Sequence, residues 1–165
     1  MGAARQLAGR LVELHGRPVP KPFRIHALLS HAFPDARRLA SASSIGLAMP
    51  AARLASLRAV AEATVANPNL FRPFGGIEET LARLKAIRGV GEWTAHYIAL
   101  RAVRESDAFP ATDVGILRGA ASVKGAKVSP ASLLDRAELW RPWRAYAAQH
   151  LWAAGGNANN ANAAA

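Results

Sequence analysis

Glycine and proline divide this sequence into segments of helix length, and that division constrains the fold more than any other feature. Within the segments apolar residues recur every three or four positions, as at Leu7, Leu11 and Leu14, which is the periodicity of an amphipathic helix. Alternating runs of β-branched and aromatic residues are rare, so the sequence predicts an all-α fold. The expected helices cover residues 2–15, 50–67, 75–88, 92–103, 113–122, 130–140 and 142–154, with one short helix within 30–50.

Charge and cysteine usage narrow the possible functions. The 165 residues suit one domain, and they carry a formal net charge of +10. Such a field attracts a polyanion, so nucleic acid is the expected partner, ahead of an acidic protein or a membrane surface. The absence of cysteine excludes disulfides, thiolate zinc sites and a cysteine-held iron–sulfur cluster. No apolar run reaches the ~18 residues of a membrane span, and a cytoplasmic location follows.

A tight turn is expected at Gly89-Val90-Gly91, between two predicted helices. The glycines permit a turn in which the N–H groups at the start of the next helix point outward. With the helix dipole, these groups would form an anion site suited to a DNA phosphate. A simple corner between two helices explains the same glycines. The turn is no dinucleotide-binding motif, because no strand precedes it and a third glycine is missing.

Two aromatic side chains and a carboxylate follow the turn. Trp93 and Tyr97 are four residues apart and share a helix face, either as core residues or as a stacking wall for a flat ligand such as an extruded base. Thr112 can N-cap the next helix, which would place Asp113 in its first turn, where the dipole keeps a carboxylate ionised. An ordinary helix-start aspartate is the alternative. Asp107 is expected to be a solvated loop residue.

Together, these residues are identified with a known family. The stretches LKAIRGVGEWTAHYIALRAV (84–103) and FPATDVGILRG (109–119) resemble the helix-hairpin-helix DNA glycosylase superfamily, and RAELWRPWRAYAAQHLW (136–152) resembles the C-terminal signature of its DNA-3-methyladenine glycosylase II family. The resemblance covers about residues 3–153. It implies a two-lobed helical fold without the family's N-terminal α/β domain. The central helices and hairpin would form one lobe, the final helices the other, and Asp113 would face the cleft between them. The glycosylase-like domain is expected to span residues 1–154, followed by a disordered low-complexity tail at 155–165.

The resemblance also implies roles for individual residues. Asp113 would be the catalytic carboxylate, and Trp93, Tyr97 and Trp152 would bind the extruded base. A lysine stands at position 93 in the strand-cleaving members of the superfamily; tryptophan here implies a monofunctional glycosylase that leaves an abasic site. His96 is expected to be structural.

DNA contacts are expected at the hairpin. The resemblance places them on Gly89, Val90, Gly91 and Thr94, with duplex DNA as the partner. No metal or organic cofactor is expected, apart from a monovalent cation held by hairpin carbonyls.

Three functions remain open at this point. The chain is an alkylated-base (3-methyladenine-type) N-glycosylase of base-excision repair, a truncated inactive paralogue, or a non-catalytic DNA-binding module. The last reading includes a separately encoded N-terminal segment or an alkylation-response regulator as partner. The expected location is the bacterial cytoplasm, in association with the nucleoid.

Overall fold

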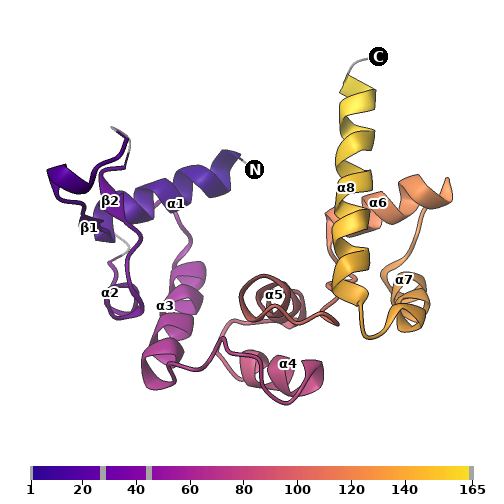
Figure 1. Cartoon of the computed structure of the whole chain (residues 1–165), viewed down its shortest axis with the longest axis horizontal. Helices are drawn as coiled ribbons and strands as arrows, with labels where there is room; N and C mark the ends of the chain where they lie inside the picture. The colour runs from indigo at the N-terminus through magenta and orange to yellow at the C-terminus, as the bar shows by residue number, and fades with distance from the viewer. Residues whose placement is uncertain (1, 27–28, 44–45, 164–165) are drawn as a thin grey trace. The chain divides into compact units, whose positions relative to one another are not determined.

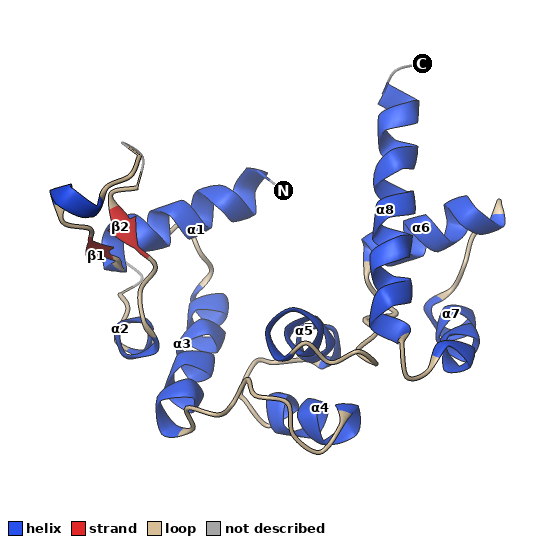
Figure 2. Cartoon of the chain, viewed as in Figure 1, coloured by secondary structure: helices blue, strands red, loops and turns tan. Residues whose placement is uncertain are grey.

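The computed structural model describes residues 2–26, 29–43 and 46–163 of the chain. The chain forms two compact units, one of residues 1–70 and 87–89 and the other of residues 71–86 and 90–165. Helices dominate both units, and the strands in the described residues are two residues long each (Figure 2). The predicted all-α fold is confirmed. Within the described ranges, no helix is both long and apolar enough to span a membrane.

The first unit packs three helices around a small apolar core (Figure 1). Its elements are α1 (Gly2–His15), β1 (Arg17–Pro18), the 3-10 helix η1 (Lys21–Phe23), β2 (His31–Ala32), α2 (Ala36–Ala40) and α3 (Ala51–Ala66). The antiparallel pairing of β1 with β2 falls where the sequence indicates only a linker. The buried core consists of Leu11, Leu39, Leu47, Leu54 and Ala61. Four of them come from the three helices, and Leu47 comes from the segment between α2 and α3, so the apolar stripes predicted from periodicity face one another.

The second unit contains every residue for which the sequence predicts a catalytic or base-binding role. Its elements are α4 (Ile77–Lys85), α5 (Glu92–Ile98), the π-helix η2 (Ala99–Val103), α6 (Val114–Lys124), α7 (Pro130–Ala137), the 3-10 helix η3 (Glu138–Trp140) and α8 (Arg144–Ala163). Ser129 caps α7 by accepting the N–H of Ser132 at 3.1 Å, as the Ser-Pro pair predicts.

The division into units corrects the expected division into lobes. The sequence places the hairpin helices and the final helices in different lobes, whereas α5 and α8 belong to the same unit. α5 and α8 lie in the same unit because both contact Asp113. Trp93 of α5 and Trp152 of α8 each donate a hydrogen bond to its carboxylate. The helices that separate from them are α1 to α3, which have their own core.

Glycines allow α6 and α8 to cross closely. A Cβ added to Gly119 on α6 would lie 2.5 Å from the carbonyl carbon of Leu151 on α8, and one added to Gly155 would lie 2.9 Å from the carbonyl oxygen of Gly115. The sequence places the end of this last helix at Gly155, which is wrong, since α8 continues to Ala163. Gly155 is a helical residue needed for the close crossing, rather than a C-cap. Of the expected tail at 155–165, residues 155–163 form the end of α8, and residues 164–165 lie outside the described residues.

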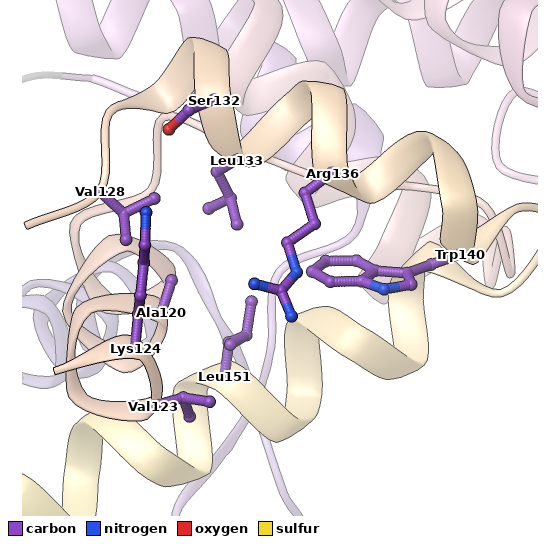
Figure 3. Close-up of a pocket in the computed structure, with 9 residues that line it drawn as sticks. All are labelled: Ala120, Val123, Lys124, Val128, Ser132, Leu133, Arg136, Trp140 and Leu151. Atoms are coloured by element: carbon purple, nitrogen blue, oxygen red, sulfur yellow. The ribbon is translucent and has the colours of Figure 1, made fainter. Parts of the chain in front are cut away.

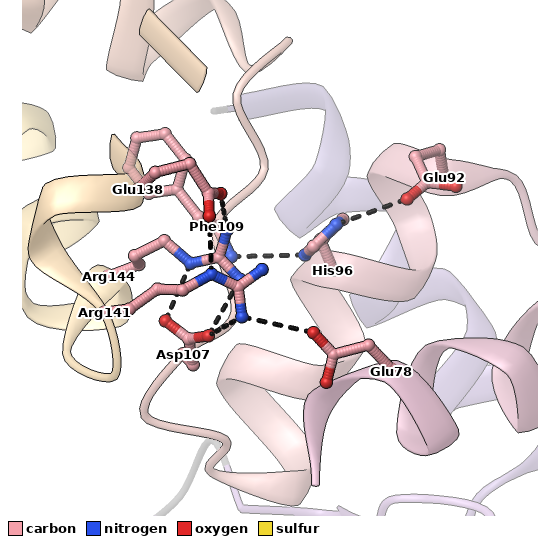
Figure 4. A network of polar contacts seen from close by, with 8 residues as sticks. All are labelled: Glu78, Glu92, His96, Asp107, Phe109, Glu138, Arg141 and Arg144. Atoms are coloured by element: carbon pink, nitrogen blue, oxygen red, sulfur yellow. Dashed lines mark hydrogen bonds and ion pairs between the residues drawn. The ribbon is translucent and has the colours of Figure 1, made fainter. Parts of the chain in front are cut away.

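A buried ion pair holds the loop before α6 against the start of α8 (Figure 4). Asp107 is 7% exposed and Arg144 is 4% exposed. Arg144 donates through Nε to Asp107 Oδ1 at 2.7 Å and through Nη2 to Oδ2 at 2.8 Å, and Arg141 donates to the same Oδ2 at 2.8 Å. The expectation that Asp107 is a solvated loop residue is therefore wrong. Its partners are 34 and 37 residues away along the chain, too distant for a local pattern to reveal.

Candidate active site

Asp113 stands at the junction of the loop and α6, where four hydrogen bonds converge on its carboxylate. Its Oδ1 accepts the backbone N–H groups of Gly115 at 2.9 Å and Ile116 at 3.1 Å. The same oxygen accepts Nε1–H of Trp152 at 2.7 Å, while Oδ2 accepts Nε1–H of Trp93 at 3.0 Å. The expected neighbourhood of Asp113, Trp93 and Trp152 is present.

The first pair of bonds makes Asp113 the N-cap of α6, with extended backbone angles of φ −66° and ψ 126°. The sequence assigns the cap to Thr112, one residue earlier, and this is wrong. Both side chains are competent caps, and the choice depends on where the backbone turns helical.

The carboxylate is held in its ionised form. Burial acts to raise the pKa of Asp113, but the hydrogen bonds from Trp152, Ile116, Trp93 and Gly115 lower it, and the net pKa lies below the ordinary aspartate value. Each of these donors points at the anion, and its hydrogen bond would be weaker if the carboxyl were protonated. The side chain is therefore a stable negative charge near neutral pH and a weak proton acceptor.

Aromatic rings form an open wall beside this charge. Trp93 and Tyr97 stack with their ring centroids 5.2 Å apart and their planes 17° apart. Trp152 meets Tyr97 edge-on, with centroids 6.1 Å apart and planes at 72°. Trp93 is 42% exposed and Tyr97 36% exposed, so these two rings are not core residues, the alternative that the sequence leaves open. The structure places a flat, accessible surface next to an anion.

The guanidinium of Arg101 also lies beside these rings, a contact that the sequence analysis did not predict. The guanidinium carbon of Arg101 lies 5.1 Å from the ring centroid of Trp152 and 5.8 Å from that of Tyr97. Trp93, Tyr97 and Arg101 follow one another at intervals of four residues, so their spacing is the signal that could have revealed the contact.

His96 ties α5 to the loop that leads into Asp113 (Figure 4). Its Nδ1 accepts the backbone N–H of Phe109 at 3.1 Å, and its Nε2 lies 3.3 Å from Oε1 of Glu92. Burial lowers the pKa of His96, although the nearby Glu92 acts to raise it. A neutral ring with an unprotonated Nδ1 is the form that accepts from Phe109, which agrees with the expected structural role.

The hairpin before α5 has the geometry that its glycines indicate. Gly89 has φ +84°, and a Cβ there would lie 2.8 Å from the Cβ of Ser56, so only glycine fits. Gly91 is the N-cap residue of α5, and no described side chain caps that helix start. Gly91 is exposed, Thr94 is half-buried and Val90 is 7% exposed. The uncapped N–H groups are what a phosphate site needs. The DNA contacts of Gly89, Val90, Gly91 and Thr94 and the monovalent cation stay predictions.

Comparison with known proteins shows which proteins this chain resembles in sequence. No family model matches the chain. The chain is 42% identical over 151 residues to the probable bifunctional transcriptional activator/DNA repair enzyme AlkA of Mycobacterium tuberculosis, a match covering 91% of this chain and 29% of the relative. It is 31% identical over 153 residues to DNA-3-methyladenine glycosylase 2 of Escherichia coli, covering 90% of this chain and 50% of the relative.

The chain is similar to DNA-3-methyladenine glycosylases over about 90% of its own length.

A solved structure of a DNA glycosylase is similar to the chain as well. The 3-methyladenine DNA glycosylase of Schizosaccharomyces pombe, in complex with abasic DNA, superposes with a TM-score of 0.63 at 25% identity, over 78% of this chain and 66% of that protein. The chain spans half or less of the length of the two curated relatives described above.

A concave region lies between α6, α7 and α8 (Figure 3). It is lined by Ala120, Val123, Lys124, Val128, Ser132, Leu133, Arg136, Trp140 and Leu151. None of these residues has a role predicted from the family. Leu151 lines this depression, whereas the next residue, Trp152, bonds Asp113, so α8 presents the two features on different faces.

Proposed function

We propose that this chain is a monofunctional DNA N-glycosylase that releases alkylated, 3-methyladenine-type bases from duplex DNA in base-excision repair. The observation that carries the proposal is the convergence of the Trp93 and Trp152 indole N–H groups on the carboxylate of Asp113. This convergence fixes an anion beside an exposed wall of aromatic rings, which is the arrangement that an extruded nucleotide requires.

Asp113 would act as an electrostatic stabiliser. When the N-glycosidic bond breaks, its electron pair leaves with the base, which neutralises a cationic alkylated purine, and positive charge develops on the sugar. A carboxylate held ionised beside that charge stabilises the transition state. Water then adds to C1′ and its proton passes to solvent. Because Asp113 has a lowered pKa, stabilising the cation suits it better than removing a proton from the water.

Trp93, Tyr97 and Trp152 would hold the base. Electron-rich rings attract a cationic base through their faces in addition to stacking on it. An alkylated purine that already carries positive charge is a good leaving group, so the site needs no strong general acid. Trp93 stands where a lyase would need lysine, so the expected product is an abasic site without strand cleavage.

The basic charge and the hairpin would bind the duplex without reading its sequence. A net charge of +10 attracts the phosphate backbone, and the backbone N–H groups around Gly89, Val90 and Gly91, with Thr94, would fix its position. A monovalent cation on the hairpin carbonyls would strengthen that contact. Association with the nucleoid is the expected consequence. A separately encoded N-terminal segment or an alkylation-response regulator is a further proposed partner.

The test is release of methylated purines from alkylated duplex DNA, with abasic sites detected by alkaline cleavage. The wild-type chain should release base and leave strands intact before alkali. Asp113→Asn should lower the rate by about 10²–10³-fold, the usual effect of removing one electrostatic stabiliser, while asparagine preserves the helix cap. Asp135→Asn makes the same change at an exposed residue of α7 and should have no effect.

Other outcomes would favour the alternatives. Salt-sensitive DNA binding without base release would indicate a DNA-binding module, and folded protein that neither binds nor cleaves would indicate an inactive paralogue.

A further inference from the structure

Arg101 lies over two of the three aromatic rings that the proposed function assigns to the base. Its guanidinium carbon lies within 6 Å of two ring centroids, those of Trp152 at 5.1 Å and Tyr97 at 5.8 Å. This is the range in which a cation is attracted to an aromatic face. In the described part of the chain, no carboxylate pairs with Arg101, so the rings are the contacts that hold it.

The position of Arg101 follows from the helix. Trp93 and Tyr97 lie on α5, and Arg101 lies one turn further along, in the π-helix η2. On the other side of the group, Trp152 presents its N–H edge to Asp113 and its face to Arg101. Trp152 thus contacts an anion through its N–H edge and a cation through its face.

A resident cation changes what the wall prefers to bind. Bare rings would favour a cationic base over a neutral one of the same shape. With Arg101 in place, a cationic base must either displace the guanidinium from the rings or lie close to a like charge. A neutral base stacks without the repulsion, and the guanidinium can then rest on the face of that base.

We propose that Arg101 is a specificity-determining residue of this wall, whose guanidinium lowers the preference for cationic flat bases relative to neutral ones. The inference rests on the proposed function for its meaning in catalysis, but its physical content is a binding preference that can be measured without any reaction.

The binding test compares two probes of nearly the same shape. Tryptophan fluorescence of the full chain is titrated with 1-methylquinolinium chloride, a cation, and with quinoline, which is neutral at pH 8. Arg101→Met keeps an apolar side chain and removes the charge. The ratio of the two dissociation constants should shift by about five-fold toward the cation, the size of one exposed cation–π contact. Arg101→Lys should keep a ratio close to that of wild type.

The matched control is Arg118→Met. Arg118 is an exposed residue of α6, and its loss changes the net charge by the same amount without touching the rings. The inference is overturned if Arg101→Met leaves the ratio unchanged, if Arg118→Met shifts it equally, or if neither probe binds the wild-type chain.

A kinetic test connects the preference to base release. Single-turnover release is measured from duplexes that carry one N7-methylated, cationic purine or one neutral modified purine. Arg101→Met should raise the ratio of cationic to neutral base release, also by about five-fold. Failure of the wild-type chain to release either base would refute the proposed function, and the probe titration would still decide the role of Arg101. An unchanged release ratio in an active enzyme would refute the role of Arg101 alone.

Discussion

Replacing Trp152 with phenylalanine tests whether the indole N–H groups hold Asp113 ionised. The substitution keeps an aromatic ring against Tyr97 and removes one donor, the 2.7 Å bond to Oδ1. A hydrogen bond to a charged acceptor contributes about 1.5–3 kcal/mol. The lower end applies because Asp113 is half-buried and water can replace part of the lost bond. A loss of about 1.5 kcal/mol corresponds to a roughly ten-fold higher affinity of the carboxylate for a proton, so the pKa of Asp113 should rise toward its ordinary value.

The measurement is an NMR titration of the Asp113 carboxyl carbon in wild type and in Trp152→Phe. Stability provides a second readout. A lowered pKa in the folded state contributes stability above the unfolded pKa, and this contribution is lost as pH falls through the folded pKa. The variant should therefore be less stable near neutral pH, with the difference narrowing in acid. Trp143→Phe, at a 58% exposed position, is the control. An unchanged pKa of Asp113 in Trp152→Phe would refute the reasoning.

Further substitutions test the supports around the site. Arg144→Met should lower the free energy of unfolding by about 3 kcal/mol, the lower end of the usual cost of removing one partner of a buried ion pair, because Arg141 still bonds Asp107. Urea unfolding should show partial recovery when Asp107→Asn is added. Wild-type stability should fall as pH decreases from the ordinary histidine pKa toward the lowered pKa of His96. His96→Asn keeps a hydrogen-bond acceptor but does not titrate. In thermal melts at a series of pH values, this variant should therefore show a weaker dependence of stability on pH. Gly155→Ala should destabilise by about 1–3 kcal/mol through crowding. Its neighbour is the control: a Cβ on Gly156 meets nothing within 4 Å, so Gly156→Ala should stabilise by about 0.5–1 kcal/mol in the same melts.

Local sequence patterns predicted the parts of this protein that local physics determines. Helix periodicity, the Ser129-Pro130 start of α7 and the tight turn at Gly89 all depend on residues within a few positions of one another. The shared face of Trp93 and Tyr97 has the same origin. Asp113 was placed near a helix start for this reason as well, with an error of one residue in the cap.

Features that depend on distant partners escaped the same reasoning. Asp107 is buried because it pairs with Arg144 of α8. No sequence pattern around Asp107 predicts that partner. Gly155 resembles a helix stop, yet its lack of a side chain serves the crossing with α6. Trp152 entered the site only through the family resemblance, since nothing near residue 152 indicates a hydrogen bond to a residue 39 positions earlier.

The two indole bonds to Asp113 also make the docking of the last helix a proton-linked event. Trp152 belongs to α8, so its bond to the carboxylate forms only when that helix rests on α6. Any opening that lifts α8 away returns Asp113 to a more ordinary proton affinity, and protonation of Asp113 in turn weakens the hold on α8. Acid strong enough to protonate Asp113, below the ordinary aspartate pKa, should therefore loosen the C-terminal helix before the rest of its unit. In that partly open state Asp113 would be uncharged, and Trp152 would no longer lie beside Tyr97.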